Sequence, residues 1–243
     1  MLTAAASCGE QWDAQPSQTA VAESHESKFR VGYPLAAHAM NHAGTALAVY
    51  RRHPLVAASS ARIALENSLA AQWVLLTRDG ERILVKHMEA LYLTRARAFS
   101  AAMEDPSELA DIAARSAAPG RERQWSAEQL FKRFADNNLF YDIYRQLSGA
   151  VHPSYETILA HLDLRMPASK QTISRNGDLN RDEIAATALA MASVFALDFF
   201  ERCLKEPPRP SPVAAIAELA GLPYDLGLSD QMPELQPGVQ TPT

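Results

Sequence analysis

The chain has 243 residues, of which 47% are hydrophobic and 21% charged, and its formal net charge is −5 at pH 7. It contains 43 alanines but only 10 glycines, which argues against a large all-β protein and against a glycine-rich phosphate-binding enzyme. The acidic balance excludes a broad basic surface that coats a nucleic-acid backbone, although a compact site with a few arginines is still allowed. Two cysteines, Cys8 and Cys203, are too few for a disulfide scaffold or a cysteine-rich zinc site.

The first 27 residues are rich in Ser, Gln, Ala and Glu and show no apolar periodicity. Residues 1–27 are therefore predicted to form a disordered N-terminal arm. The start also lacks the basic segment and the long apolar stretch of a signal peptide. The longest uncharged run, Val31–Tyr50, is interrupted by Pro34 and His38, which indicates a buried helix rather than a membrane span. We expect a cytoplasmic protein with no membrane partner.

The last 43 residues contain eight of the 15 prolines. Because proline interrupts helices and strands, this density predicts that the folded body ends near Lys205 and that residues 206–243 form a Pro-rich tail. Apolar residues at helical spacing within this tail predict one short helix over residues 211–220. From about Ser229 onward the tail is predicted to be disordered.

Between the two ends, residues 28–205 are predicted to form an all-α helical bundle, because apolar residues recur at helical spacing in segment after segment. Pro34 and Pro54 are each placed in the first turn of a helix, since proline is tolerated where the backbone N–H has no partner. Ser126, followed three residues later by Gln129, has the spacing of a capping box at a helix start. The expected helices span about residues 34–52, 54–78, 81–103, 106–118, 127–136, 139–151 and 181–204. A turn is expected at Asp79-Gly80, a linker at 119–125 and a polar loop at 166–180.

Two stripes run along the predicted helix at 139–151, offset by one residue. The first has the 4-3-4 spacing of a core-facing seam: Phe140, Tyr144, Leu147 and Val151. The second has the same spacing and carries polar functional groups: Tyr141, Arg145, Ser148 and His152. Residues beside a core seam line the crevice between helices or between subunits, which makes this second stripe the candidate site.

Arg145, followed by six residues and then His152, resembles the Arg-x(4–6)-His signature of HEPN-domain proteins. The longer string Tyr-x-x-Leu-Ser-x-x-Val-His-Pro-Ser, from Tyr144 to Ser154, is similar to bacterial HEPN-like families of uncharacterised function. Arg62 and Glu66, four residues apart, resemble an Arg/Glu pair found early in such bundles. The resemblance extends over about residues 30–205.

This resemblance implies a metal-independent endoribonuclease that needs no cofactor and that works in a toxin–antitoxin or phage-defence setting. Its catalytic residues would be Arg145 and His152, supported by Tyr141, Ser148, Arg62 and Glu66. The implied partners are RNA, a second copy of the chain in a homodimer with a composite site, and an antitoxin or other partner protein. The chemistry fits the residue types, because imidazole titrates near neutrality and the guanidinium fork matches phosphate oxygens.

Three other interpretations stay open. In the first, the same bundle is a non-catalytic module for dimerisation or for binding nucleotide or RNA, in which His152 caps its helix and Arg145 pairs with a carboxylate. In the second, Ser148 and His152 form a nucleophile–base pair, although no Gly-x-Ser-x-Gly turn surrounds the serine. In the third, His38 and His42, four residues apart on one helix face, share a metal ion. Arg115, Arg121, Arg123, Lys132 and Arg133 form the one basic concentration, which is interpreted as a solvated surface or an RNA-contacting lip.

Overall fold

The structure is a computed structural model that describes residues 1–16, 19–102, 126–135, 137–152, 155–162, 166–170, 172–173 and 182–229. Within these residues the chain is helical and contains isolated β-bridges but no strand. The predicted all-α helical bundle is therefore confirmed. The helices are α1 Leu2–Asp13, α2 Glu26–Val49, α3 Pro54–Leu76, α4 Gly80–Ala102, α6 Ala127–Phe131, α7 Asn137–Ser148, α8 Tyr155–Ala160, α9 Asp182–Cys203 and α10 Pro212–Ala220, with short 3₁₀ turns at Glu23–His25 and Ala168–Lys170.

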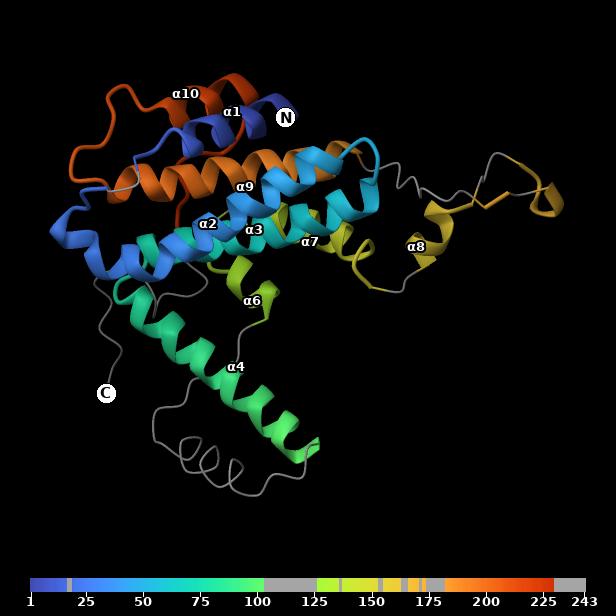
Figure 1. The fold of residues 1–243 in the computed structure, drawn as a ribbon, viewed down its shortest axis with the longest axis horizontal. Helices are drawn as coiled ribbons and strands as arrows, with labels where there is room; N and C mark the ends of the chain where they lie inside the picture. Colours follow the sequence, from blue (N-terminus) through green and yellow to red (C-terminus); the bar gives the residue numbers. More distant parts are fainter. Residues whose placement is uncertain are drawn as a thin grey trace.

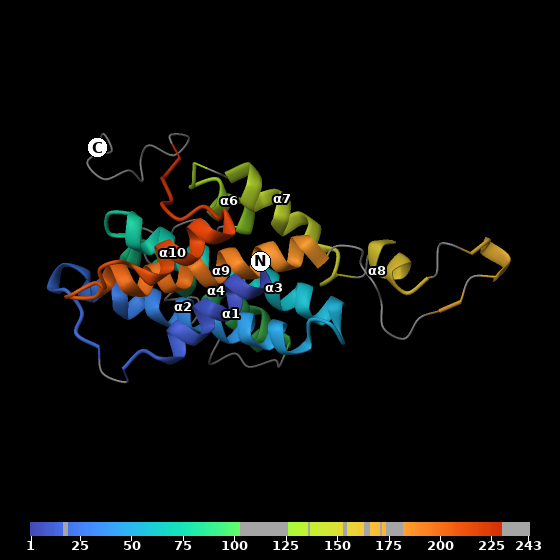
Figure 2. The same cartoon turned by 90° about the horizontal axis from the view of Figure 1, so that it is seen from above.

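Helix α9 is the centre of the bundle, because it is apolar on nearly every side. Its core residues include Leu189, Phe195 and Phe199, none of which is exposed to solvent. Figures 1 and 2 show α9 between α2 and α3 on one side and the terminal helices α1 and α10 on the other. Alanines fill many of the contact positions on α2 and α3, and their small side chains let the backbones approach closely. The high alanine content thus serves helix packing as well as helix propensity.

Several predicted elements are confirmed nearly to the residue. Helix α3 begins at Pro54, α4 follows the Asp79-Gly80 turn, and α9 covers the predicted last helix. Ser126 and Gln129 form the predicted capping box, in which the Ser126 hydroxyl accepts from the Gln129 backbone N–H and the Gln129 side chain accepts from the Ser126 N–H. The helix expected at 106–118 and the linker at 119–125 lie outside the described residues.

The predicted start of α2, the helix expected at about residues 34–52, is wrong. Pro34 lies inside α2, which begins eight residues earlier at Glu26. An internal proline removes a backbone hydrogen bond and strains the turn before it, so this segment needs compensation. Packing supplies it: Phe29 and Tyr33 stack on each other with ring centroids 5.0 Å apart, and both contact Phe200 of α9. Tertiary contacts here override the local proline signal.

The predicted disordered arm is also wrong for residues 2–13, which form helix α1. Ala4, Ala5 and Cys8 are buried against the bundle, and Trp12 stacks on Tyr33 with centroids 5.7 Å apart. The small residues allow close approach to α9, and the single tryptophan adds a large apolar surface at the end of the helix. Neither feature gives large apolar residues at helical spacing, so the sequence of residues 2–13 does not indicate a helix.

The folded body also extends past the predicted end at Lys205. The short helix expected at 211–220 is present as α10, and its Val213 and Ala217 are buried on α9 and α1. Ser211 caps its start by accepting from the Ala214 N–H at 3.1 Å. Leu226 beyond it is buried as well. The part of the tail predicted to be disordered, from 230 to 243, lies outside the described residues.

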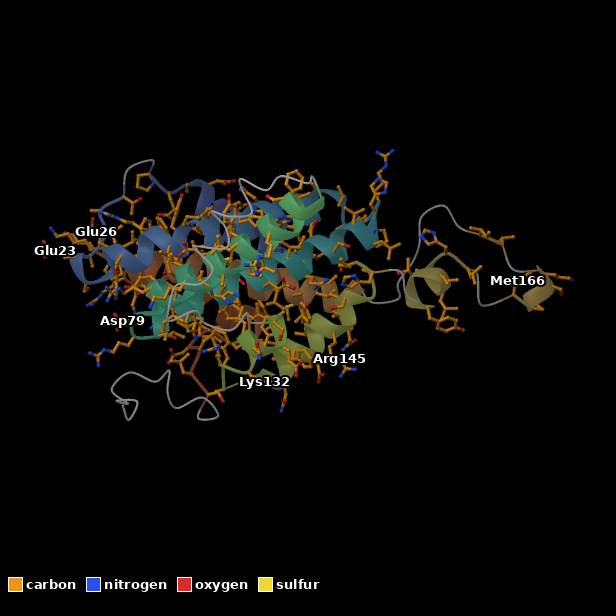
Figure 3. The ribbon with its side chains drawn as sticks, turned by 90° about the horizontal axis from the view of Figure 1, so that it is seen from below. Glu23, Glu26, Asp79, Lys132, Arg145 and Met166 are labelled. Carbon is orange, nitrogen blue, oxygen red and sulfur yellow. The ribbon has the colours of Figure 1, made fainter. Side chains whose placement is uncertain are left out.

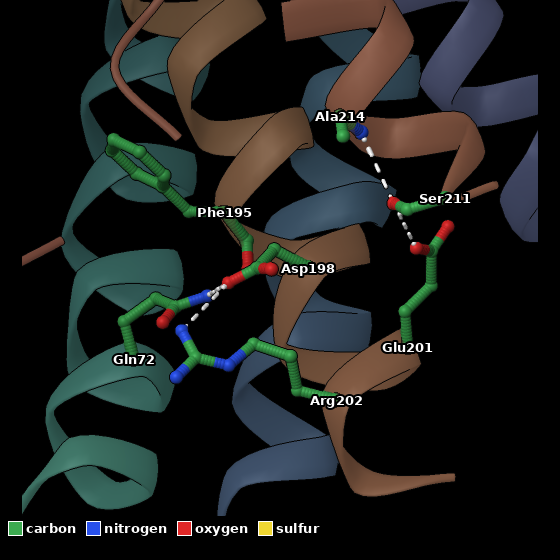
Figure 4. A network of polar contacts seen from close by, with 7 residues as sticks. All are labelled: Gln72, Phe195, Asp198, Glu201, Arg202, Ser211 and Ala214. Carbon is green, nitrogen blue, oxygen red and sulfur yellow. Dashed lines mark hydrogen bonds and ion pairs between the residues drawn. The ribbon is translucent and has the colours of Figure 1, made fainter. Parts of the chain in front are cut away.

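A buried polar network joins α3 to α9 (Figure 4). The Gln72 amide donates to the Phe195 carbonyl at 2.8 Å and to the Asp198 carboxylate at 2.7 Å. Asp198 is 1% exposed, and its ion pair with Arg202 is long, at 3.6 Å. Burial raises the pKa of Asp198 to about 6, against the opposing effects of Arg202 and Gln72. Next to it, the Glu201 carboxylate accepts from the Ser211 hydroxyl at 2.6 Å and so ties α9 to α10.

Lys28 of α2 provides a cap for the C-terminal end of α3. Its ammonium group donates to the Leu75 carbonyl at 2.7 Å and to the Thr77 carbonyl at 2.8 Å. The last carbonyls of a helix have no partner within it, and the helix dipole favours a positive charge at this end. The Thr77 carbonyl, just after α3, also accepts from the Gly80 backbone N–H at 3.3 Å.

Replacing this lysine tests the cap. Lys28→Met keeps most of the aliphatic stem but removes the ammonium donor from both carbonyls, of which only that of Thr77 keeps a second donor, so we expect a loss of about 1–3 kcal/mol in unfolding free energy. Chemical denaturation measures it, with Lys86→Met on the exposed side of α4 as the matched control. A loss no larger than that of the control would show that water replaces the ammonium group without cost.

One helix in the described part of the chain, Glu183–Cys203, is long and apolar enough to cross a membrane by length and composition. It is the central helix of the bundle, and 83% of its most apolar window is buried inside the protein. The burial of this helix among α1, α2, α3 and α10 accounts for its apolar character.

Candidate functional site

Helix α7 has one face fixed in the core and the opposite face open to solvent. Phe140, Ile143 and Leu147 are buried, and the Phe140 ring meets the rings of Phe134 and Phe195 edge-on at 5.9 and 5.7 Å. The predicted core seam is thus present for most of its length, except that Val151 is 41% exposed. The packing fixes the rotation of α7, and with it the direction of every outward side chain.

The four predicted polar residues lie along one flank of α7 and the turn that follows it. Arg145 is exposed on the outer side of the helix (Figure 3), and its guanidinium lies 5.9 Å from the ring centroid of Tyr141. Tyr141 is half-buried. The Ser148 hydroxyl donates to the Tyr144 carbonyl at 2.8 Å, a bond within the helix that does not direct the hydroxyl toward His152.

His152 lies one turn beyond the end of α7. Its backbone N–H donates to the Ser148 carbonyl at 3.3 Å, and its own carbonyl accepts from the Thr157 hydroxyl at 3.2 Å, so its backbone is held from both sides. The imidazole is exposed. Arg145 and His152 are seven positions apart, or about 10 Å along a helix axis, and no contact between their side chains is present. The chain thus presents both groups to solvent without bringing them together.

Arg62 and Glu66 of α3 contact α7 at Tyr144, a residue of the predicted core seam. Arg62 donates to the Tyr144 hydroxyl, and its guanidinium carbon lies 4.4 Å from the centroid of that ring. The Arg62 Nε is 3.2 Å from a Glu66 carboxylate oxygen, and the Tyr144 hydroxyl also bonds to Glu66. Arg62, Glu66 and Tyr144, called the α3–α7 triad below, join the two helices.

Burial governs the electrostatics of the triad. It raises the pKa of Glu66 although the neighbouring Arg62 opposes the shift. It raises the pKa of Tyr144 as well, and the Glu66 charge acts in the same direction. The triad therefore holds one cation and one incompletely solvated carboxylate in a half-buried position.

A chain of stacked groups connects the triad to the outer face of α7. The Tyr144 ring lies parallel to the Tyr141 ring, with centroids 6.3 Å apart, and Arg145 lies beyond Tyr141. The contacts of Arg62 and Glu66 thus extend to Tyr141 and Arg145 through Tyr144. Tyr144 is the member that sequence reasoning missed, because an aromatic residue at a seam position is indistinguishable from ordinary core.

The histidine pair lies on α2, away from α7. The rings of His38 and His42 meet edge-on with centroids 4.5 Å apart. Partial burial lowers the pKa of His42, and the His38 charge adds to that effect. No group of three or more metal-ligating side chains occurs among the residues that the structure describes.

The fold places the neighbouring basic residues Lys132 and Arg133 in different environments. Lys132 forms a 2.8 Å ion pair with Glu128 on the same surface, whereas Arg133 is 8% exposed and lies over the Trp73 ring. Arg133 is thus part of the core and does not contribute to a solvated basic surface. Arg115, Arg121 and Arg123 lie outside the described residues.

Comparison of this chain with protein-family models, with curated proteins and with solved structures finds no match. The similarity to HEPN-domain proteins stays a prediction from the motif and its helical setting.

Proposed function

We propose that the outer face of α7 cleaves RNA without a metal ion, as the HEPN endoribonucleases that its motif resembles do. The observation that carries the proposal is that Arg145 on α7 and His152 in the turn after it both reach solvent, while the opposite face of α7 is fixed in the core. An enzyme that acts on a polymer needs its functional groups on an open, rigid surface, and this flank meets that requirement.

The reaction uses the RNA's own 2′-hydroxyl as nucleophile. The His152 imidazole takes the 2′-hydroxyl proton, the 2′-oxygen attacks the adjacent phosphorus, and the bond to the 5′-oxygen breaks. The protonated imidazole or water returns a proton to the leaving oxygen. Arg145 binds the non-bridging phosphate oxygens with its paired N–H donors and stabilises the charge that develops on them. The products are a 2′,3′-cyclic phosphate and a free 5′-hydroxyl.

A second copy of the chain closes the gap between the two groups. Three exposed apolar side chains lie near His152 in the chain: Val151, Tyr155 and Ile158. Exposed apolar residues in one region are typical of an interaction surface, and pairing across a two-fold axis would place Arg145 of one subunit near His152 of the other. The setting that fits such a dimer is toxin–antitoxin or phage defence, with an antitoxin or another protein as its partner.

A ribonuclease assay with chelator present tests the proposal. We expect the wild type to cleave single-stranded RNA, and Arg145→Ala and His152→Ala each to lose at least about 100-fold in rate. Arg78→Ala and His53→Ala, which remove the same side chains from other exposed positions, are the matched controls and should retain activity. Circular dichroism shows that each variant is folded.

Two results of this assay would contradict the ribonuclease proposal. Absence of cleavage by purified wild type, or undiminished cleavage by His152→Ala, contradicts the proposal. Mixing the two inactive variants restores part of the activity if each site draws Arg145 and His152 from different subunits.

The second candidate function is a non-catalytic module for dimerisation or for binding nucleotide or RNA. The observation that favours it is that Ser148 is hydrogen-bonded within its own helix and that Arg145 rests on Tyr141. If Arg145→Ala splits a dimer or weakens RNA binding while the wild type cleaves nothing, this function replaces the first.

A further inference from the structure

A cavity of about 200 Å³ lies where α4 leaves the bundle, with walls from α2, α3, α4 and α6. Figure 1 shows α4 diverging from α2 and α3 at this point. Much of its wall is apolar and includes Ala70, Leu84 and Leu130. For comparison, a cavity of about 150 Å³ in another protein accepts benzene. The space therefore fits a ligand built on a single six-membered ring with a few further atoms.

Four polar side chains line the same cavity: Glu66, Asn67, His87 and Ser126. Glu66 is the triad carboxylate, and about a third of its side chain, 32%, is still exposed beyond its contact with Arg62. The Asn67 amide is held by a 2.8 Å bond to the Ile63 carbonyl, and His87 is 4% exposed. An apolar cavity with a few convergent polar groups is the usual form of a small-molecule site.

The charge of Glu66 determines which ligand such a site prefers. Desolvation raises its pKa more than Arg62 lowers it, which means that one arginine does not replace the solvation that the carboxylate has lost. A ligand that brings a second positive N–H donor restores part of that solvation. A neutral ligand of the same shape forms a weaker hydrogen bond to the Glu66 carboxylate, and an anionic ligand is repelled by it.

We propose that this cavity binds a small organic amine, whose apolar ring packs among Ala70, Leu84 and Leu130 and whose ammonium group donates to Glu66. Arg145 and His152 do not line this cavity, and the inference does not depend on RNA cleavage. Because Glu66 also bonds to Arg62 and Tyr144, the amine would contact the same residues that tie α3 to α7.

Calorimetric titration of the full chain with benzylamine tests the proposal, with benzyl alcohol as the uncharged comparison. We expect saturable one-to-one binding of benzylamine, with an affinity roughly tenfold or more above that of benzyl alcohol, as a charge-assisted hydrogen bond supplies. Glu66→Gln should remove that difference and leave benzyl alcohol binding within about twofold of the wild type. Glu218→Gln, on the exposed side of α10, is the matched control and should bind as the wild type does.

A cavity-filling variant gives an independent check. Ala70→Leu places extra carbon atoms in the cavity from α3 and should weaken both ligands about equally, with retained folding confirmed by circular dichroism. The proposal is overturned if the wild type shows no saturable binding, if benzyl alcohol binds as tightly as benzylamine, or if folded Ala70→Leu binds both as the wild type does. The comparison of two ligands on the wild type needs no variant and holds even if Glu66→Gln does not fold.

Discussion

Gly32→Ala should lower the unfolding free energy by about 2–3 kcal/mol, although alanine is a better helix former than glycine. The reason is the contact between α2 and α9. A Cβ atom built on Gly32 would lie 2.4 Å from the Phe199 ring, far inside normal contact distance. Phe199 is fully buried and stacks on Phe29 with centroids 6.3 Å apart, so the ring has no room to withdraw. One of the two helices must move.

The same helix provides the control. Gly44 is exposed, and a Cβ atom added there would meet nothing within 4 Å. Gly44→Ala should therefore stabilise the protein by about 0.5–1 kcal/mol, through helix propensity alone. Chemical denaturation of both variants measures the two effects, and we expect opposite signs. Two stabilising substitutions would mean that α2 and α9 are not packed as closely as described.

The second large effect is a gain in stability as the pH falls from 7 to 5. The pKa of Asp198 rises from an ordinary value of 3.8 to about 6 in the folded protein, mainly because the carboxyl group is buried. The folded state then binds more protons than the unfolded state between these two values, so protonation favours folding. The full penalty above pH 6 is about 3 kcal/mol, from a shift of about 2 pH units at about 1.4 kcal/mol each. Roughly 1 kcal/mol of it is recovered by pH 5.

Asp198→Asn isolates this contribution. Asparagine keeps an acceptor for the Gln72 amide and removes the buried charge, so the variant should be more stable than the wild type at pH 7 by about 1–3 kcal/mol. Its stability should also depend less on pH between 5 and 7. Because burial raises the pKa values of Glu66 and Glu201 too, some dependence of the same sign should persist. Equal slopes for variant and wild type would contradict the assignment to Asp198.

The sequence predicted the long helices well because their signals are local. Pro54 at a helix start, the Asp79-Gly80 turn and the Ser126–Gln129 capping box all act within a few residues. It failed where distant contacts decide the structure. The interior position of Pro34 and the helix at residues 2–13 are both maintained by packing against α9, which lies more than 150 residues away in the chain.

In the candidate site, too, the sequence predicts what local spacing decides and not what contacts between distant segments decide. Periodicity placed Tyr141, Arg145, Ser148 and His152 on one flank of a helix; the structure has the first three on α7 and His152 in the turn after it. Periodicity within α7 carries no information on the side chains that a neighbouring helix contributes, so it does not predict the hydrogen bond between Arg62 of α3 and Tyr144. Helical spacing also carries no information on cavities, which form between elements far apart in sequence, as the one beside Glu66 does.

The packing of α1 on α9 and α10 has a consequence for the order in which the chain folds during synthesis. Residues 2–13 are made before α9 and α10, the helices that bury them, which end at Cys203 and Ala220. At about 5–20 residues per second, translation separates α1 from α9 by roughly 10–40 s. During that interval Trp12 has its stacking partner Tyr33 of α2 but lacks Phe200 of α9, so the face of α1 that α9 and α10 later cover is open to a chaperone. Helix α1 therefore completes its packing only after α9 and α10 have been synthesised.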